Sequence, residues 1–319
     1  MINSVLIGTS EDTLREAFGR AICDLASKRD ELVLLDADIA GGTGAHHFRS
    51  EFPKRFLQMG IAEQNMMSVA AGISDMGLTP IVTTFAIFCI RAVEQARLSI
   101  AYNNRNVKIF ASHPGLDVGP DGASAQCLED LAIFRSIPNF TVISPADPLE
   151  MALATEAAVS NYGPFYIRTG RSKTESFLPS DHKFVIGKGQ ILRAGSDVAI
   201  ICCGKQTFRS LKAADSLEKI GISVTVVNMP TIKPIDGFLL ESIASSHKGL
   251  IVTEDHNIFG GLFGAVSEYL ATNRPTKIVP VCVRDKFGES GEPEELAQKY
   301  EIDTNSIIKA VVKLLEIHQ

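Results

Sequence analysis

The sequence predicts an α/β protein of two domains, each built on a mostly parallel sheet. Short apolar runs rich in β-branched residues alternate along the chain with longer segments of helical pattern. These short runs are continuously apolar, which is typical of parallel strands covered by helices on both faces. The length of 319 residues exceeds one ordinary domain and suits two domains of about 150 residues each.

In the first half, strand-like and helix-like segments alternate. Thr9 and Ser10 are predicted to cap a helix that ends near Arg29. The predicted strands are Glu31–Asp36, Phe56–Gln58, Pro80–Thr84, Asn106–Ala111, Phe140–Ser144 and Phe165–Arg168. The predicted helices begin at Glu63, lie near Ala92–Tyr102 and span Pro148–Ser160.

A change in composition divides the chain. Residues 171–188 lose the alternation and gain charge, Ser and Pro. We therefore assign residues 1–175 to the first domain, 176–190 to a linker and 191–319 to the second domain. In the second domain the predicted strands are Asp197–Cys203, Ile222–Met229, Gly249–Glu254 and Lys277–Val283, and the predicted helices lie near Gln206–Lys219, Gly260–Thr272 and Asp303–Glu316.

Charge and composition exclude several classes of partner. The net charge is −6 and no block of Lys and Arg occurs, so neither nucleic acid nor anionic lipid is an expected partner. No apolar run approaches the roughly 20 residues of a membrane span, and the N-terminus lacks the pattern of a signal peptide. The six cysteines form no CxxC pair, which favours free thiols in a reducing compartment. We expect a cytoplasmic protein.

A carboxylate stands at the start of an apolar helix. Residues 56–77 read FLQMGIAEQNMMSVAAGISDMG, and no charge follows Glu63 until Asp75. Burying an ionised carboxylate is costly unless it is paired or held protonated, so a chain that keeps one there is usually using it. The alternative is a carboxylate stabilised by the helix dipole and the free N–H groups of the first turn. The pattern alone leaves both readings open.

Two further clusters follow predicted strands, where the ligand sites of open α/β sheets lie. Phe85 and Phe88, three residues apart, can clamp a flat ring, although core aromatics have the same spacing. Residues 112–122 read SHPGLDVGPDG, a loop dense in Gly and Pro. A β-turn explains Asp121 in this loop but not His113.

The last cluster is charged. Asp36 and Asp38 lie in LLDADIAGGTG, Arg168 lies in FYIRTGR, and Arg15 lies in the first predicted helix. Arg can bind a phosphate or similar oxyanion through its fork of donors. Taken singly, each of these charges is better explained as a solvated surface group, and the Gly-rich stretch 41–44 lacks the spacing of a phosphate loop.

Taken together and in this order, these segments resemble the C-terminal half of transketolase, and most closely the smaller subunit of transketolases encoded as two chains. FPKRFLQMGIAEQNM, TPIVTTFAIF, the Gly-Pro-Asp-Gly loop and SIPNFTVISPAD carry the resemblance. It covers the whole chain and is strongest over residues 10–170. The family implies a pyrimidine-binding domain for thiamine diphosphate, followed by a transketolase C-terminal-like domain.

The resemblance also implies a role for each candidate residue. Glu63 would be the catalytic residue, which hydrogen-bonds the aminopyrimidine ring of thiamine diphosphate and promotes the tautomer that deprotonates the thiazolium carbon. The cofactor then carries a two-carbon ketol unit from a ketose to an aldose. The implied cofactor contacts are Asp38, Glu63, Phe85 and Phe88, and the implied contacts to an anionic sugar are Arg15, His113, Asp121 and Arg168.

Two departures from the family concern the substrate. The family loop usually ends Gly-x-Ser/Thr-His-Gln, whereas here Ala125 stands where the histidine contacts the sugar. A small hydroxyl residue common in the family is also replaced near Gly41 and Gly42. Both changes remove polar contacts, so we expect a non-standard sugar, such as a branched or sulfonated ketose.

The metal site of the family has no counterpart in this sequence. Thiamine enzymes hold the diphosphate through Mg²⁺ (or Ca²⁺) bound by a Gly-Asp-Gly…Asn motif, and no Gly-Asp-Gly occurs here. The resemblance therefore implies an N-terminal transketolase subunit that carries this motif and an α2β2 assembly, with no metal ligands for the cofactor on this chain.

Other functions stay open at this stage. The β subunit of a 2-oxo acid dehydrogenase's decarboxylating component shares the layout, and GIAEQ also admits a deoxyxylulose-phosphate synthase-like enzyme. The segments SIAY and IPNF favour transketolase. A catalytically degenerate scaffold subunit is a further alternative, against which the intact Glu63, Phe85 and Phe88 argue. The second domain shows no chemical constellation, and His256 in TEDHNIFGG is expected to be structural.

Overall fold

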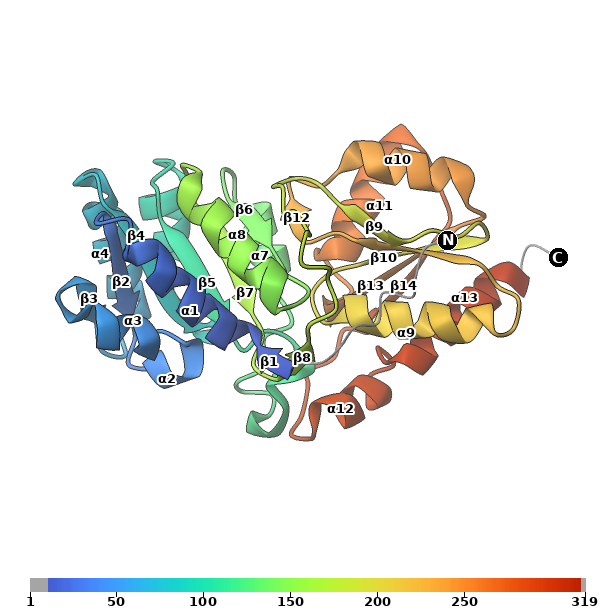
Figure 1. Ribbon diagram of the computed structural model, residues 1–319, viewed down its shortest axis with the longest axis horizontal. Coiled ribbons are helices and arrows are strands. Elements are labelled where there is room, and N and C mark those ends of the chain that lie inside the picture. The colour runs from blue at the N-terminus through green and yellow to red at the C-terminus, as the bar shows by residue number, and fades with distance from the viewer. Residues whose placement is uncertain (1–10, 317–319) are drawn as a thin grey trace.

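The computed structural model describes residues 11–316 and confirms two α/β domains with mostly parallel sheets. The first half of the chain, blue to green in Figure 1, forms one domain, and the yellow-to-red half forms the other. Thr9 and Ser10, which were predicted to cap the first helix, lie outside the described residues. Within them, Thr13 accepts the N–H of Glu16 and begins the helix at Leu14.

The first domain contains a seven-stranded sheet in the order β12-β6-β7-β5-β4-β2-β3, parallel except for β12. Its strands are β2 (Leu32–Asp36), β3 (Phe56–Gln58), β4 (Thr79–Phe85), β5 (Lys108–Ser112), β6 (Thr141–Ile143), β7 (Phe165–Thr169) and β12 (Thr231–Lys233). Its helices are α1 (Leu14–Ala26), α2 (Ala40–Thr43), α3 (His46–Glu51), η1 (Pro53–Arg55), α4 (Glu63–Asp75), α5 (Ala86–Arg91), α6 (Val93–Gln95), η2 (Ala96–Ala101), η3 (Leu116–Asp121), α7 (Asp130–Ser136) and α8 (Pro148–Ser160).

The second domain contains a five-stranded sheet in the order β14-β13-β10-β11-β9, with only β9 antiparallel. Its strands are β9 (Gln190–Arg193), β10 (Val198–Cys202), β11 (Val224–Asn228), β13 (Leu250–Asn257) and β14 (Ile278–Val283). Its helices are α9 (Gln206–Glu218), α10 (Gly237–Ser246), α11 (Leu262–Asn273), α12 (Pro293–Lys299) and α13 (Thr304–Glu316). A two-stranded ribbon of β1 (Glu11–Thr13) and β8 (Lys173–Glu175) lies near the junction of the domains (Figure 1).

Helices cover both faces of the first sheet, which explains the continuously apolar strands. On one face, side chains of α1, α3 and α8, including Phe18, Phe48 and Met151, form a core with residues of the strands. The opposite face packs against α4, α5, η2 and α7, and this core continues into α10 and α11 of the second domain. One apolar core therefore continues across the junction of the two domains.

Several features differ from the sequence prediction, which did not include α7, α10, α12 and β9. The helix predicted near Ala92–Tyr102 begins earlier, at Ala86, and the non-helical backbone of Ala92 (φ −105°, ψ 18°) divides it into α5 and then α6 with the π-helical turn η2. The strand β12, from the second half of the chain, joins the first sheet beside β6. Such a long-range pairing leaves no local signal. Within residues 11–316 no helix is long and apolar enough to cross a membrane.

Candidate active site

The strand order gathers the candidate residues at one edge of the first sheet. The neighbouring strands β7, β5, β4, β2 and β3 are parallel, so their carboxyl ends lie side by side. Phe85 at the end of β4 pairs in register with Ser112 at the end of β5. In an open α/β sheet this edge is where ligands bind.

Glu63 is the first residue of α4 and is 4% exposed. No residue in the range 11–316 donates a hydrogen bond to its carboxylate, and its helix begins without a side-chain cap. Burial raises the pKa of the Cys89 thiol, and the charges of Asp130 and Glu63 add to this rise, so the Glu63 carboxylate lies near Cys89. Burying a carboxylate that has no hydrogen-bond donor from the protein is costly. The Glu63 carboxylate is therefore suited to accept a hydrogen bond from a ligand.

Three aromatic rings lie in a row beside the carboxyl end of β4. The rings of Phe85 and Phe88 are stacked with centroids 5.4 Å apart, and the ring of His113 stacks on Phe85 with centroids 3.6 Å apart. Phe88 is 37% exposed, so the row reaches the surface. A Cβ on Gly42 would lie 2.7 Å from Cε1 of Phe85, so only glycine leaves room for that ring.

The hydrogen bonds around His113 fix its tautomer. Ser112 Oγ donates to the carbonyl oxygen of Gly42 (2.9 Å) and lies 2.6 Å from His113 Nδ1. Because the single hydroxyl hydrogen is used, Nδ1 must carry the proton and donate it to Oγ. Burial, with Arg15 and Arg171 nearby, lowers the pKa of His113 to about 3. Nε2 therefore presents a lone pair, and no group within residues 11–316 hydrogen-bonds to it.

The two acidic residues after β2 have different environments. Asp36 is buried and accepts hydrogen bonds from the Ile39 N–H (2.9 Å) and the Thr83 hydroxyl (3.0 Å), so it supports the turn. Asp38 is exposed, with a positive φ of 68°. Gln58 donates to the Asp38 carboxylate (3.1 Å) and accepts the N–H of Gly60. Gln58 thus links Asp38 to the turn that precedes Glu63.

The three arginines of interest also differ. Arg15 donates to the carbonyl oxygen of Gly42 (3.3 Å), and its Nε has no partner. Arg171, which the sequence reading missed, is partly exposed and donates to the carbonyl oxygen of Val118 (2.7 Å). Its charge contributes to the lowered pKa of His113, so Arg171 lies within electrostatic reach of that ring. The FYIRTGR segment contains both Arg168 and Arg171. They differ because Arg168 lies in the buried strand β7, whereas Arg171 follows the end of that strand.

Arg168 is committed to a buried ion pair. Its Nε lies 2.8 Å from Asp130, its Nη1 donates to the backbone oxygen of Asp255 (2.9 Å), and its side chain is 6% exposed. Burial alone would raise the pKa of Asp130, but the Arg168 guanidinium outweighs it and holds that pKa below its usual value. The predicted contact of Arg168 with a sugar anion does not fit this geometry, because the donor fork faces protein.

The loop from His113 to Gly122 is held by the second domain. The carboxylate of Asp255 accepts the N–H groups of Leu116 (2.9 Å) and Asp117 (3.1 Å). A Cβ on Gly115 would lie 2.3 Å from that carboxylate. Gln126, beyond the loop, donates to the backbone oxygen of Glu289 (2.9 Å). Asp121 remains exposed at the tip, where Arg171 reaches it.

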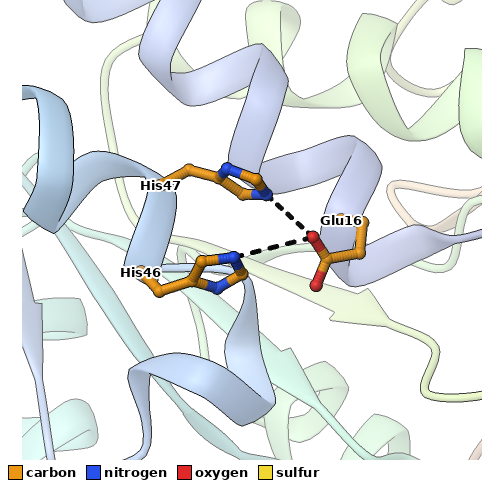
Figure 2. Close-up of side chains that lie close together, drawn as sticks. All are labelled: Glu16, His46 and His47. Atoms are coloured by element: carbon orange, nitrogen blue, oxygen red, sulfur yellow. Dashed lines mark hydrogen bonds and ion pairs between the residues drawn. The ribbon is translucent and has the colours of Figure 1, made fainter.

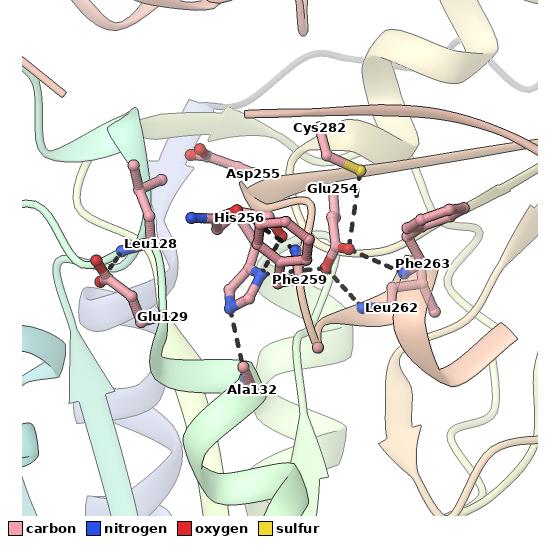
Figure 3. Close-up of polar contacts among 12 residues, drawn as sticks. Leu128, Glu129, Ala132, Glu254, Asp255, His256, Phe259, Leu262, Phe263 and Cys282 are labelled. Atoms are coloured by element: carbon pink, nitrogen blue, oxygen red, sulfur yellow. Dashed lines mark hydrogen bonds and ion pairs between the residues drawn. The ribbon is translucent and has the colours of Figure 1, made fainter. Parts of the chain in front are cut away.

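Three successive residues of β13 contact three different elements (Figure 3). Glu254 accepts the N–H groups of Leu262 (2.6 Å) and Phe263 (2.9 Å) at the start of α11, and Asp255 faces the loop described above. His256 is fully buried, and its Nε2 accepts the N–H of Ala132 in α7 (3.4 Å). The buried contact of His256 with α7 indicates a structural role. Within TEDHN, Asp255 is the residue that contacts the candidate site, through the loop that follows His113.

Comparisons with known proteins agree with this architecture. The family model described as "Transketolase, pyrimidine binding domain" matches residues 11–176, and that described as "Transketolase, C-terminal domain" matches residues 187–307. These matches span most of the chain.

Individual proteins are similar over nearly their whole length. A "Putative transketolase C-terminal section" of Methanocaldococcus jannaschii is 41% identical over 94% of this chain and 95% of that protein. The 6-deoxy-6-sulfo-D-fructose transketolase subunit SqwH of Clostridium sp. (strain MSTE9) is 34% identical, covering 96% of this chain and 95% of that one. A solved split-gene transketolase, described as an inactive β4 tetramer, superposes with a TM-score of 0.90 at 42% identity, covering 96% of this chain and 99% of that chain.

Proposed function

Because the chain belongs to the transketolase family, we propose that it is one subunit of a thiamine diphosphate-dependent transketolase. In this proposal the enzyme transfers a two-carbon ketol unit from an anionic ketose to an aldose phosphate. Glu63 is its catalytic residue. The observation that carries the proposal is the Glu63 carboxylate, 4% exposed and without a hydrogen-bond donor among residues 11–316, at the sheet edge that holds the aromatic row.

The residues at this edge fit the aminopyrimidine half of the cofactor. Phe88, which ends the stacked row at the surface, offers an aromatic face to a flat ring, and Phe85 supports it from behind. Glu63 offers an oxygen to a ring N–H. When bound, thiamine diphosphate supplies the electron sink that a ketol transfer needs. Glu63 holds a proton between its oxygen and the ring nitrogen, which sets the tautomer of that ring. Asp38, fixed by Gln58, is the acidic residue that we place near the thiazolium.

The substrate contacts follow from which donors and acceptors are free. The charges of Arg15 and Arg171 both lower the pKa of His113, and these two arginines are the pair that we propose for the terminal anion of the sugar, in place of Arg15 with Arg168. The Nε2 lone pair of His113 accepts a hydrogen bond from a sugar hydroxyl, because the Nδ1–H of His113 is donated to Ser112. Asp121 lies at the loop tip beside Arg171 and accepts a second hydroxyl. Ala125 leaves the usual histidine contact unfilled.

The partner in this proposal is an N-terminal transketolase subunit that carries the Gly-Asp-Gly…Asn motif and binds Mg²⁺ or Ca²⁺ with the diphosphate. The similarity to a C-terminal section and to a split-gene transketolase supports two chains. Four chains, two of each kind, form the proposed α2β2 enzyme in the cytoplasm. This chain supplies the pyrimidine side of each active site.

Two classes of donor ketose carry a terminal anion that these arginines could bind. Guanidinium groups bind phosphate and sulfonate through the same fork of N–H donors. The similarity to a subunit of a transketolase for 6-deoxy-6-sulfo-D-fructose, together with Ala125, supports a sulfonated ketose as one candidate. A ketose phosphate is the other.

The test is reconstitution with the partner subunit, thiamine diphosphate and Mg²⁺, followed by assay with ketose phosphate, sulfonated ketose and pyruvate. We expect ketol transfer from an anionic ketose only when both subunits are present. Transfer by this chain alone would contradict the split subunit. Decarboxylation of pyruvate instead of ketol transfer would favour the 2-oxo acid dehydrogenase or deoxyxylulose-phosphate synthase alternative, and no activity with any donor would favour a scaffold subunit.

A further inference from the structure

Glu16, His46 and His47 form a cluster between helices α1 and α3 (Figure 2). His47 Nε2 lies 2.7 Å from Glu16 Oε2, and His46 Nε2 lies 3.9 Å from the same oxygen. The two imidazole rings have centroids 4.1 Å apart. Two rings from successive residues thus converge on one carboxylate oxygen.

Helix geometry alone does not produce this convergence. Successive helical residues point about 100° apart, and both side chains are about one-third exposed, at 36% for His46 and 30% for His47. Either ring could turn to solvent. No hydrogen bond from residues 11–316 reaches the His46 ring, and its Nδ1 atom is buried without a partner. The ring is therefore held close to Glu16 and His47 with its hydrogen-bonding capacity unused.

We propose that Glu16, His46 and His47 bind a divalent transition-metal ion, most favourably Zn²⁺, with water as the fourth ligand. Two imidazoles and one carboxylate are a ligand set that zinc uses in sites with three protein ligands. With bonds of about 2.0–2.1 Å in a tetrahedron, ligand atoms lie about 3.3 Å apart. The two separations to Glu16 Oε2, 2.7 Å and 3.9 Å, bracket this value, so small side-chain rotations centre an ion.

The ligand chemistry separates this site from the proposed cofactor metal. Imidazole favours Zn²⁺, Cu²⁺ and Ni²⁺, whereas Mg²⁺ and Ca²⁺ prefer oxygen ligands. The six cysteines are buried, so they offer no accessible competing site within this chain. Millimolar Mg²⁺ in an assay buffer would therefore leave this site available to zinc.

The scaffold around the cluster is tightly packed. A Cβ on Gly19 would lie 2.5 Å from the carbonyl oxygen of Gly44 and 2.6 Å from Cδ2 of His47. Glycine at 19 thus lets α1 approach the turn before α3. An ion bound by Glu16, His46 and His47 would join α1 to α3 and brace the intervening segment, whose Gly42 lies against Phe85.

The experiment uses the full chain, stripped with EDTA and exchanged into metal-free buffer. Titration with Co²⁺ in the presence of excess Mg²⁺ is expected to give one ion per chain and the intense visible absorption of tetrahedral Co²⁺. Zn²⁺ is expected to displace it and to raise the melting temperature. His46→Ala and His47→Ala should abolish the absorption, and Glu16→Gln should weaken Co²⁺ at least tenfold.

His247→Ala, in the second domain, is the matched control and should bind as the wild type does. Circular dichroism establishes that each variant is folded. Lack of tetrahedral Co²⁺ absorption in the wild type would overturn the proposal, and so would unchanged binding in Glu16→Gln together with either histidine variant. None of these readouts depends on transketolase activity, so the proposed function and the metal site are tested separately.

Discussion

Asp255, in the second domain, is predicted to set the position of the loop from His113 to Gly122. Asp255→Asn tests this prediction with little change in side-chain size. In the structure its two oxygens accept the N–H groups of Leu116 (2.9 Å) and Asp117 (3.1 Å). An amide side chain has one acceptor oxygen, so Asn keeps one of these bonds and turns its NH₂ group toward the other donor. The loop that carries His113 and Asp121 then loses one of its anchors.

The size of the effect follows from the bond that is lost. A hydrogen bond to a charged acceptor contributes about 1.5–3 kcal/mol. Burial raises the pKa of Asp255, so removing its charge also removes a desolvation cost, which offsets part of this loss. We therefore expect a net loss of about 1.5–2 kcal/mol, equivalent to roughly a tenfold to thirtyfold fall in kcat/KM for the ketose. The fall should appear mainly in KM, while the affinity for thiamine diphosphate stays unchanged.

The preceding residue is the matched control. Glu254 also accepts two backbone N–H groups, but those belong to α11 of its own domain. Glu254→Gln should lower the melting temperature and leave KM for the ketose unchanged. Hydrogen exchange at Leu116 and Asp117 should accelerate only in Asp255→Asn. An unchanged KM together with wild-type exchange at both amides in Asp255→Asn would refute the reasoning.

Three further predictions concern the site. Arg171→Gln should raise KM for the anionic ketose at least tenfold without lowering the melting temperature. Arg168→Met should instead destabilise the chain by about 3–5 kcal/mol, because it leaves Asp130 buried and unpaired. Steady-state kinetics and calorimetry measure the two effects, and the opposite pattern would restore Arg168 as the anion ligand. The pKa of His113 is lowered to about 3 from 6.5, so the unfolded chain binds the extra proton as pH falls below 6.5 and stability is lost toward the folded pKa. At pH 4.5 the expected loss in the free energy of unfolding is about 2–3 kcal/mol. Denaturant unfolding at pH 7 and pH 4.5 should show that His113→Asn loses less stability than the wild type. An equal loss would contradict the burial of a neutral ring. Gly42→Ala should destabilise the chain by about 1–3 kcal/mol through overpacking against Phe85 and should weaken cofactor binding in the reconstituted enzyme; wild-type stability and affinity would show that the ring moves freely.

The sequence predicted the architecture well because its strands are covered on both faces. Continuous apolar runs such as Leu32–Asp36 and Val198–Cys202 identify buried parallel strands without any knowledge of their neighbours. Helices with a clear capping signal were equally visible, as in α8, where Asp147 accepts the N–H of Glu150 and Pro148 follows. By contrast, the place of β12 in the first sheet depends on a partner strand nearly ninety residues earlier, between Thr231 and Ile143.

The candidate site could be predicted only where one residue is anomalous by itself. Glu63 stood out because its charge stands at the start of an apolar helix. Arg168 and Arg171 could not be separated, since one faces a buried aspartate and the other the solvent-exposed loop, and both facts depend on the fold. The role proposed for Asp255 depends on the contact between the domains, for which the TEDHN segment carries no pattern.

Glu63→Gln in the reconstituted enzyme tests the central claim most directly, namely that Glu63 activates thiamine diphosphate held between two chains. Gln keeps the shape of the side chain and removes its ability to share a proton with the aminopyrimidine ring. Glu156→Gln, an exposed carboxylate on α8, is the control. Exchange of the thiazolium C2 proton with deuterium, followed by NMR with both subunits present, should slow by about 10²–10⁴-fold in Glu63→Gln and stay unchanged in Glu156→Gln. An exchange rate within twofold of the wild type in Glu63→Gln, with the cofactor bound, would contradict the claim.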